Sequence, residues 1–288
     1  MGEFTANTLP AVIDTHCHLT FPDFSGPDSA GRRRVPGGVG GVLERARAHD
    51  VNGCITVSTT TADCLEALAI AAANPAVWCT SGVHPLHADE GPHDWANLAV
   101  VARHERCVAW GELGLDNHYA EPGRDVQRGV LEEQLAFIEG RAAEGLVKPV
   151  VIHCREAFDD LIPILRGTRL DPGRFVFHCF TGTAGDMRKV LDFGACVSFT
   201  GVLTYKNGAE VREAAALVPA GRVMVETDAP FLPPEPHRGT RPCEPWMTSL
   251  TARRLAEARG VAWEAFHEEL RETTRRFFGI EEAGWTGG

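Results

Sequence analysis

Histidine and carboxylate side chains recur along this chain in short clusters of a kind that binds divalent metal ions. The first cluster is Asp14-Thr-His16-Cys-His18, in which the two histidines stand two positions apart. If this segment is a β-strand, His16 and His18 point to one face and Cys17 to the other, because side chains alternate. Two imidazoles one strand repeat apart can bind the same ion. Further candidates follow at His84, Glu112, Asp116, His153, Arg155, His178, Glu226 and Asp228.

The types of these side chains limit the metals that they could hold. Imidazole and carboxylate ligands without thiolate suit Zn, Mn, Fe or Ni, and Mg where oxygen ligands dominate. Four histidines and two carboxylates exceed the needs of one ion, whereas two ions about 3.5–4 Å apart would use all six and activate a water. The six candidate metal ligands are His16, His18, Glu112, His153, His178 and Asp228. Some barrel hydrolases bridge their two ions with a carbamylated lysine, but none of the three lysines here ends a predicted strand. Glu112 is therefore the available bridge.

The elements that position these clusters follow from short runs rich in β-branched residues. Eight such runs predict strands, and they are 11–14, 53–58, 77–83, 107–112, 149–153, 174–178, 195–200 and 222–226. Between them, apolar residues at three- and four-residue spacing predict helices, for example over 37–50, 61–75 and 125–145. Six of the eight predicted strand ends carry His, Asp or Glu.

Alternating strands and helices favour an α/β fold with a parallel sheet, and eight such units favour a (β/α)8 TIM barrel. In that fold the carboxyl ends of the strands form the active-site face, which would bring the clusters together. A doubly wound sheet is the competing architecture, but no glycine-rich nucleotide-binding fingerprint follows the first strand. We expect one domain over 1–288 with a core of about 11–280, because no linker-like break divides the chain.

Composition narrows the partners of such a barrel. The 28 basic and 39 acidic residues give a net charge of −11, which disfavours non-specific coating of nucleic acid or anionic membrane but leaves room for one strand end in a local site. The nine cysteines form no CxxC pair, and the chain opens without a secretory signal, so we expect reduced thiols in the cytoplasm. No apolar stretch approaches the roughly 18 residues that span a bilayer.

Six motifs together resemble the TatD-type metal-dependent hydrolases of the amidohydrolase superfamily. They are DTHCHL (14–19), GVHP (82–85), GELGLD (111–116), PVVIHCREA (149–157), FHCFTG (177–182) and ETDAPFL (226–232). The resemblance implies an amidohydrolase-like barrel with two divalent ions and 3′–5′ exodeoxyribonuclease activity, or in some relatives deacylation of D-aminoacyl-tRNA. It also implies a division of the ligands: His16, His18 and Asp228 for one ion, His153 and His178 for the other, and Glu112 between them.

Two segments depart from the family pattern. The loop from Thr20 to Gly38, which includes Arg32–Arg34, is several residues longer than usual, and Cys243 stands near the place where an Asn commonly precedes Glu-Pro. Both segments are expected at the mouth of the barrel, where they would affect substrate preference. The arginine run is either a solvated loop or an attractor for a phosphate backbone.

The expected chemistry is hydrolysis of a phosphoester by an activated water. Glu112 and Asp228 are the expected catalytic residues, and Asp228 either takes the proton of the water or only binds metal. His84 and Arg155 would hold a substrate phosphate, although His84 could instead only brace the turn before Pro85.

Two further expectations concern the supporting residues and the substrate. Asp116 and Glu226 would orient the metal-binding imidazoles. The expected substrate is a DNA 3′ end or another small phosphoester, and a monomer is compatible with the sequence. The alternatives are an ester or amide hydrolase, such as a D-aminoacyl-tRNA deacylase, and a non-catalytic metal-binding scaffold.

Overall fold

The computed structural model describes residues 12–25 and 35–280. Its strands form one parallel sheet in the order β1-β2-β3-β4-β5-β6-β7-β8. The strands are β1 (Val12–Cys17), β2 (Val51–Thr56), β3 (Val77–Ser81), β4 (Cys107–Asp116), β5 (Val150–Arg155), β6 (Phe175–Phe177), β7 (Cys196–Phe199) and β8 (Val223–Val225). A bridge between Cys17 and Ala229, together with a hydrogen bond from the His18 N–H to the Ala229 carbonyl, brings the two edges of the sheet together.

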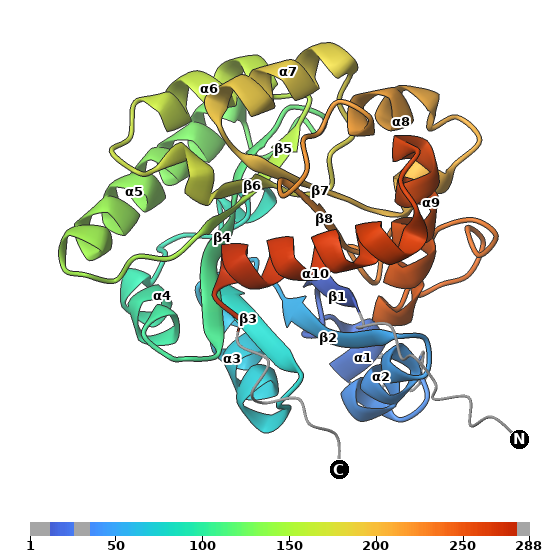
Figure 1. The fold of residues 1–288 in the computed structure, drawn as a ribbon. Coiled ribbons are helices and arrows are strands. Elements are labelled where there is room, and N and C mark those ends of the chain that lie inside the picture. Colours follow the sequence, from blue (N-terminus) through green and yellow to red (C-terminus); the bar gives the residue numbers. More distant parts are fainter. Residues whose placement is uncertain (1–11, 26–34, 281–288) are drawn as a thin grey trace, which may run out of the picture.

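Helices surround this sheet on the outside (Figure 1). They are α1 (Pro22–Ser25), α2 (Gly38–Arg47), α3 (Asp63–Ala73), α4 (Trp95–Ala102), α5 (Arg124–Ala143), α6 (Phe158–Arg166), α7 (Ala184–Phe193), α8 (Ala209–Ala215), α9 (Thr248–Arg259) and α10 (Trp263–Phe278). None of the helices in the described ranges is long and apolar enough to cross a membrane. The architecture is the predicted (β/α)8 barrel.

The hydrophobic core has two parts, one between the strands and the helices and one inside the barrel. One cluster fills the space between the strands and the surrounding helices. A second cluster lies inside the barrel and includes Ile55, Val151 and Met224 from three different strands. Phe278, at the end of α10, and Ile280 join this inner cluster, and Figure 1 shows α10 lying across the barrel. Phe278 and Ile280 therefore close one end of the barrel, and the polar clusters lie at the other.

All eight predicted strands are present, with shifted boundaries. The largest shift is in β4, which continues through Asp116, so that Glu112 lies inside the strand and not at its tip. The register between β4 and β5 shifts between Trp110 and Leu113. Irregularities of this kind redirect side chains, which explains how Glu112 turns into the site. The Arg32–Arg34 run lies outside the described residues, and the single domain over 1–288 stays a prediction.

The backbones of Gly82 and Gly111 pack closely next to Glu112, so a larger residue at Gly82 should destabilise the protein. A Cβ atom on Gly82 would come within 2.6 Å of the Cα and carbonyl carbon of Gly111. We expect Gly82→Ala to lower the free energy of unfolding by about 1–3 kcal/mol, because the strands must separate to admit the methyl group.

Gly140→Ala is the matched control, because a Cβ there meets nothing within 4 Å and the residue lies inside helix α5. This control should gain about 0.5–1 kcal/mol from its higher helix propensity. Urea denaturation measures both variants. A Gly82→Ala protein as stable as the unmodified chain would contradict the packing described here.

Candidate metal centre

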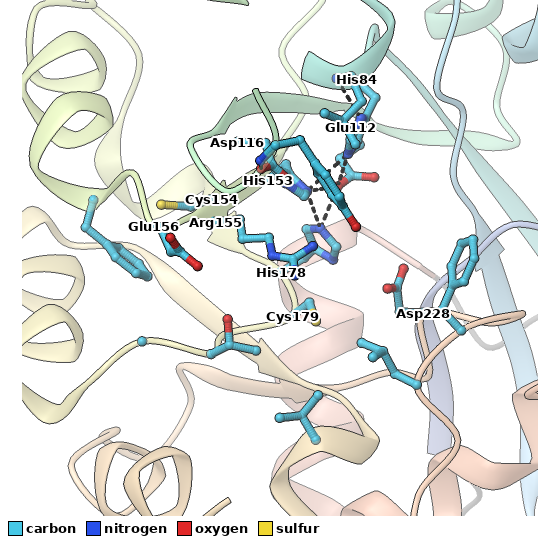
Figure 2. Close-up of a pocket in the computed structure, with 18 of the residues that line it drawn as sticks. His84, Glu112, Asp116, His153, Cys154, Arg155, Glu156, His178, Cys179 and Asp228 are labelled. Carbon is cyan, nitrogen blue, oxygen red and sulfur yellow. Dashed lines mark hydrogen bonds and ion pairs between the residues drawn. The ribbon is translucent and has the colours of Figure 1, made fainter. Parts of the chain in front are cut away.

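The predicted site residues gather at one cavity of about 1040 Å³. It lies beyond the carboxyl ends of the strands, and Figure 2 shows side chains from several strands converging on it. The predicted residues that line it are His18, His84, Glu112, Asp116, His153, Arg155, His178 and Asp228. The remaining two, His16 and Glu226, are buried directly behind these. The structure therefore brings together residues that are more than 200 positions apart in the chain.

Glu112 occupies the centre of the cluster, and its two oxygen atoms face different histidines. Oε2 lies 3.3 Å from Nε2 of His16. Oε1 lies 2.5 Å from Nε2 of His178 and 2.8 Å from Nδ1 of His153. Burial by itself raises the pKa of Glu112, but the surrounding imidazoles, His178 first, hold it well below its usual value. Glu112 is therefore a carboxylate with one oxygen toward each side of the cluster.

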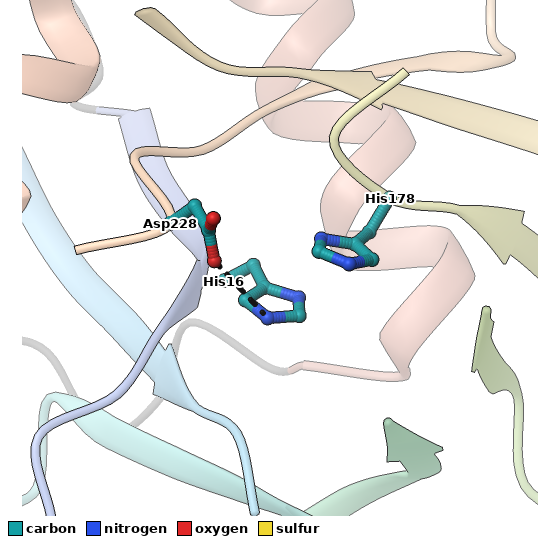
Figure 3. Close-up of side chains that lie close together, drawn as sticks. All are labelled: His16, His178 and Asp228. Atoms are coloured by element: carbon teal, nitrogen blue, oxygen red, sulfur yellow. Dashed lines mark ion pairs between the residues drawn. The ribbon is translucent and has the colours of Figure 1, made fainter. Parts of the chain in front are cut away.

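The spacing of the ring nitrogens fits metal binding. Nε2 of His16 and Nε2 of His18 are 3.3 Å apart, which is about the separation of two ligands held at 2.0–2.1 Å by a tetrahedral ion. The rings of His16 and His178 are stacked, with centroids 3.9 Å apart, and Asp228 lies beside His16 (Figure 3). Three groups bring their donor atoms within 4.8 Å of one another: His16, His178 and Asp228; His16, His18 and Glu112; and His84, Glu112 and His153.

Hydrogen bonds on the outer side of two rings fix which nitrogen faces the cluster. Nδ1 of His18 lies 3.1 Å from the Val57 carbonyl, and Nε2 of His153 lies 3.0 Å from Oδ2 of Asp116. A carbonyl or carboxylate can only accept, so each of these nitrogens carries the proton. When either ring is neutral, its other nitrogen turns a lone pair toward the cluster, as a metal ligand must.

Glu226 has the corresponding position beside His178. Its Oε1 lies 3.3 Å from Nδ1 of His178 and accepts a hydrogen bond from the Cys179 N–H at 2.6 Å. Its Oε2 accepts from the hydroxyls of Ser198 and Thr15 at 2.6 and 3.2 Å. Burial raises the pKa of Glu226, but its contacts with His178, His16 and Ser198 together lower it below its usual value. Asp116 and Glu226 thus each lie against one imidazole of the cluster.

Unlike the rings of His18 and His153, the ring of His84 has its protonated nitrogen on the side that faces the cluster. Its Nδ1 accepts a hydrogen bond from the Leu86 N–H at 3.0 Å. Because burial holds its pKa well below the usual value, the ring is neutral and its proton is on Nε2. That nitrogen lies 3.5 Å from Oε1 of Glu112 and 3.1 Å from Nδ1 of His153. His84 therefore braces its own turn and also presents an N–H to the cavity.

Asp228 follows β8 and is held in place by backbone contacts. Its N–H donates to the His16 carbonyl at 2.9 Å, and its Oδ1 lies 3.4 Å from Nε2 of His18. The preceding Thr227 donates both its N–H and its hydroxyl to Asp14. Asp14 thus ties β1 to the segment that carries Asp228, a role that the sequence did not reveal. Burial raises the pKa of Asp228, but the histidine contacts outweigh burial and lower it.

The residues that remain to be placed are Arg155 and the cysteines near the cluster. The guanidinium of Arg155 lies 5.1 Å from the centre of the Tyr119 ring at the wall of the cavity. Cys17 and Cys154 are buried and belong to the hydrophobic core, whereas Cys179 is half-buried and lines the cavity. Cys243, which departs from the family pattern, is buried, and its N–H donates to the Pro230 carbonyl at 3.0 Å.

A barrel with such a cluster at the ends of its strands belongs to the class of metal-dependent hydrolases, and the comparisons identify the family. A family model described as TatD related DNase matches residues 13–279. The metal-dependent hydrolase YcfH of Escherichia coli K12, whose activity is uncharacterised, is 34% identical over 271 residues, covering 94% of this chain and 96% of its own length. The chain therefore belongs to the TatD-related family.

Two further proteins agree with this assignment. A protein of Pantoea ananatis named 3′-5′ ssDNA/RNA exonuclease TatD is 35% identical over 245 residues, covering 83% of this chain and 92% of that one. The crystal structure of YJJV, a TatD homologue from Escherichia coli K12, superposes with a TM-score of 0.81 at 27% identity. The superposition covers 95% of this chain and 100% of YJJV. The chain is a metal-dependent hydrolase of the TatD family.

Glu226 accepts hydrogen bonds from three donors, so its replacement should destabilise the fold. Glu226→Gln places an amide NH2 among groups that donate hydrogen bonds. We expect the free energy of unfolding of chelator-treated protein to fall by about 1–3 kcal/mol, because at least one buried donor loses its acceptor. Guanidinium denaturation followed by circular dichroism measures this change.

Glu132→Gln serves as the control, because its ion pair with Arg128 lies on the exposed face of α5. Surface ion pairs contribute little, so the unfolding midpoint of this variant should not move. Equal midpoints for Glu226→Gln and the control would show that the network around His178 does not support the fold.

Proposed function

We propose that this hydrolase is a two-metal phosphodiesterase that removes nucleotides from DNA as a 3′–5′ exodeoxyribonuclease. The observation that carries the proposal is the placement of Glu112, with one carboxylate oxygen toward His16 and the other toward His153 and His178. A carboxylate so placed suits two ions that share it. The name of the Pantoea ananatis relative supports an exonuclease.

The proposed ligand sets follow the two sides of Glu112. One ion is assigned to His16, His18 and Asp228, and the other to His153 and His178. Zn, Mg and Mn are the candidate metals for these imidazole and carboxylate ligands. Divalent ions supply Lewis-acid polarisation of a phosphoryl group and make water more acidic.

The protein's own residues then take up the proton and hold the substrate. Asp228 is ionised and 17% exposed, so its carboxylate can accept the proton of the attacking water. The Nε2–H of His84 donates to a phosphate oxygen, and the guanidinium of Arg155 supplies a positive charge at the cavity wall. Asp116 and Glu226 keep the rings of His153 and His178 in position.

The placement of charge agrees with a strand end as the substrate. The net charge of −11 opposes extended binding of DNA along the surface. The cavity lining has one arginine, Arg155, and seven carboxylates, so bound divalent ions would supply most of the positive charge that a phosphate needs there. Its volume of about 1040 Å³ is large enough for a terminal nucleotide. All nine cysteines lie in the described residues and all are free, which supports the reducing, cytoplasmic environment that we propose.

A substrate panel tests this function. Chelator-treated protein is given Mg, Mn or Zn in turn and assayed on 5′-labelled single-stranded DNA with a free or a blocked 3′ end, and on D-aminoacyl-tRNA. We expect stepwise shortening of the free 3′ end only, and none without metal. Asp228→Asn should lower the rate by at least about 100-fold, because it removes both a ligand and the proton acceptor.

The control is a variant whose substitution lies away from the cavity, and two other outcomes of the panel would contradict the nuclease function. Asp192→Asn changes an exposed carboxylate on α7 away from the cavity and should keep full activity. Release of the D-amino acid without shortening of DNA would establish the deacylase alternative. Metal binding without any metal-dependent hydrolysis would favour the non-catalytic scaffold.

A further inference from the structure

Two aromatic side chains stand out by their exposure. Among the described residues, Tyr119 at 50% and Phe231 at 41% are the exposed aromatic side chains, and both line the cavity of the metal centre. Every other described Phe, Tyr or Trp is buried or half-buried. Exposed apolar rings at a binding cavity point to a ligand that covers them, since water does not stabilise them.

Phe231 lies directly beside the proposed metal ligands. Its ring centroid is 6.4 Å from that of His18 and 5.7 Å from that of Phe21, which it meets edge to face. Phe21 in turn stacks on His18 at 4.9 Å. The three rings form a continuous surface that starts at the cluster and ends at the exposed ring of Phe231. A substrate group next to the reacting phosphate would therefore meet this ring.

The backbone holds Phe231 firmly although its side chain is exposed. Its N–H donates to the Asp228 carbonyl at 2.9 Å, which closes a turn that begins at Asp228 itself. The same segment packs so closely on Gly201 that a Cβ there would lie 2.2 Å from the Leu232 carbonyl oxygen. The N–H of Cys243 also donates a hydrogen bond to the Pro230 carbonyl within this turn. A ring held in place before binding loses little entropy when it stacks on a ligand.

Tyr119 is already engaged, because the guanidinium of Arg155 lies over its ring. We propose that Phe231 is the platform on which the base of the terminal nucleotide stacks. This inference rests on the proposed nuclease function. It adds that the site recognises the terminal base of the substrate, whatever the identity of that base. Stacking on an aromatic ring tolerates all bases, because every base has a π-face.

A fluorescence experiment tests the contact itself. The metal-loaded protein is titrated with single-stranded DNA that ends in 2-aminopurine and carries a non-hydrolysable methylene phosphonate at the last linkage. We expect the protein to quench the 2-aminopurine emission. Phe231→Leu, which keeps an apolar side chain without a π-face, should lose most of the quenching and bind about tenfold more weakly. Phe231→Tyr should retain both. Full quenching by Phe231→Leu would overturn the proposal.

A second measurement compares two cleavable substrates that differ only in the terminal base. We expect kcat/KM to be about tenfold higher for a normal 3′ end than for an abasic 3′ end, a difference of one base stack. Phe231→Leu should bring this ratio close to one, while Val100→Ala, an exposed apolar residue on α4, should leave it unchanged.

The outcomes separate the inference from the function on which it rests. Equal rates on the two substrates, or a ratio that survives Phe231→Leu, would overturn the stacking platform and leave the nuclease intact. No release from either DNA would refute the nuclease, and the platform with it.

Discussion

The buried carboxylate of Glu112 is the constraint on which the site depends. A negative charge with 1% of its residue exposed is costly unless positive or proton-donating groups surround it. Here four imidazoles lie within 3.5 Å of its oxygens: His16, His84, His153 and His178. This arrangement is stable only if the charge of the cluster is balanced, by protons on the imidazoles or by bound cations. Divalent ions balance it while leaving the imidazoles neutral.

Behind the histidines that surround Glu112 lies a second layer of groups, each of which presents an oxygen atom to the outer nitrogen of one ring. Asp116 lies 3.0 Å from the ring of His153, Glu226 lies 3.3 Å from that of His178, and the Val57 carbonyl lies 3.1 Å from that of His18. Asp116 ends β4, Glu226 directly follows β8 and Val57 directly follows β2, so the position of each ring depends on the register of the sheet. Gly82 also packs closely against Gly111, the residue before Glu112, and leaves no room there for a side chain.

Much of this organisation could be predicted from sequence, because it depends on local patterns. The eight strands are visible as short β-branched runs, and the two-residue spacing of His16 and His18 places both on one face. The barrel then brings the strand ends together. The partners of Glu226 could not be predicted, because Thr15 and Ser198 are ordinary strand residues whose roles depend on contacts across 211 and 28 positions. The proton on Nε2 of His84 depends on one backbone N–H, which no residue pattern reports.

The central claim is that Glu112 joins two metal ions, and electron paramagnetic resonance of manganese tests it most directly. Mn²⁺ is titrated into chelator-treated protein while the six-line signal of isolated ions is recorded. The account predicts two bound ions per chain and loss of the six-line signal as the second ion binds, because spins bridged by one carboxylate are coupled. Glu112→Gln should abolish that coupling. Saturation at one ion, or two additive six-line signals from the unmodified protein, would contradict a shared carboxylate.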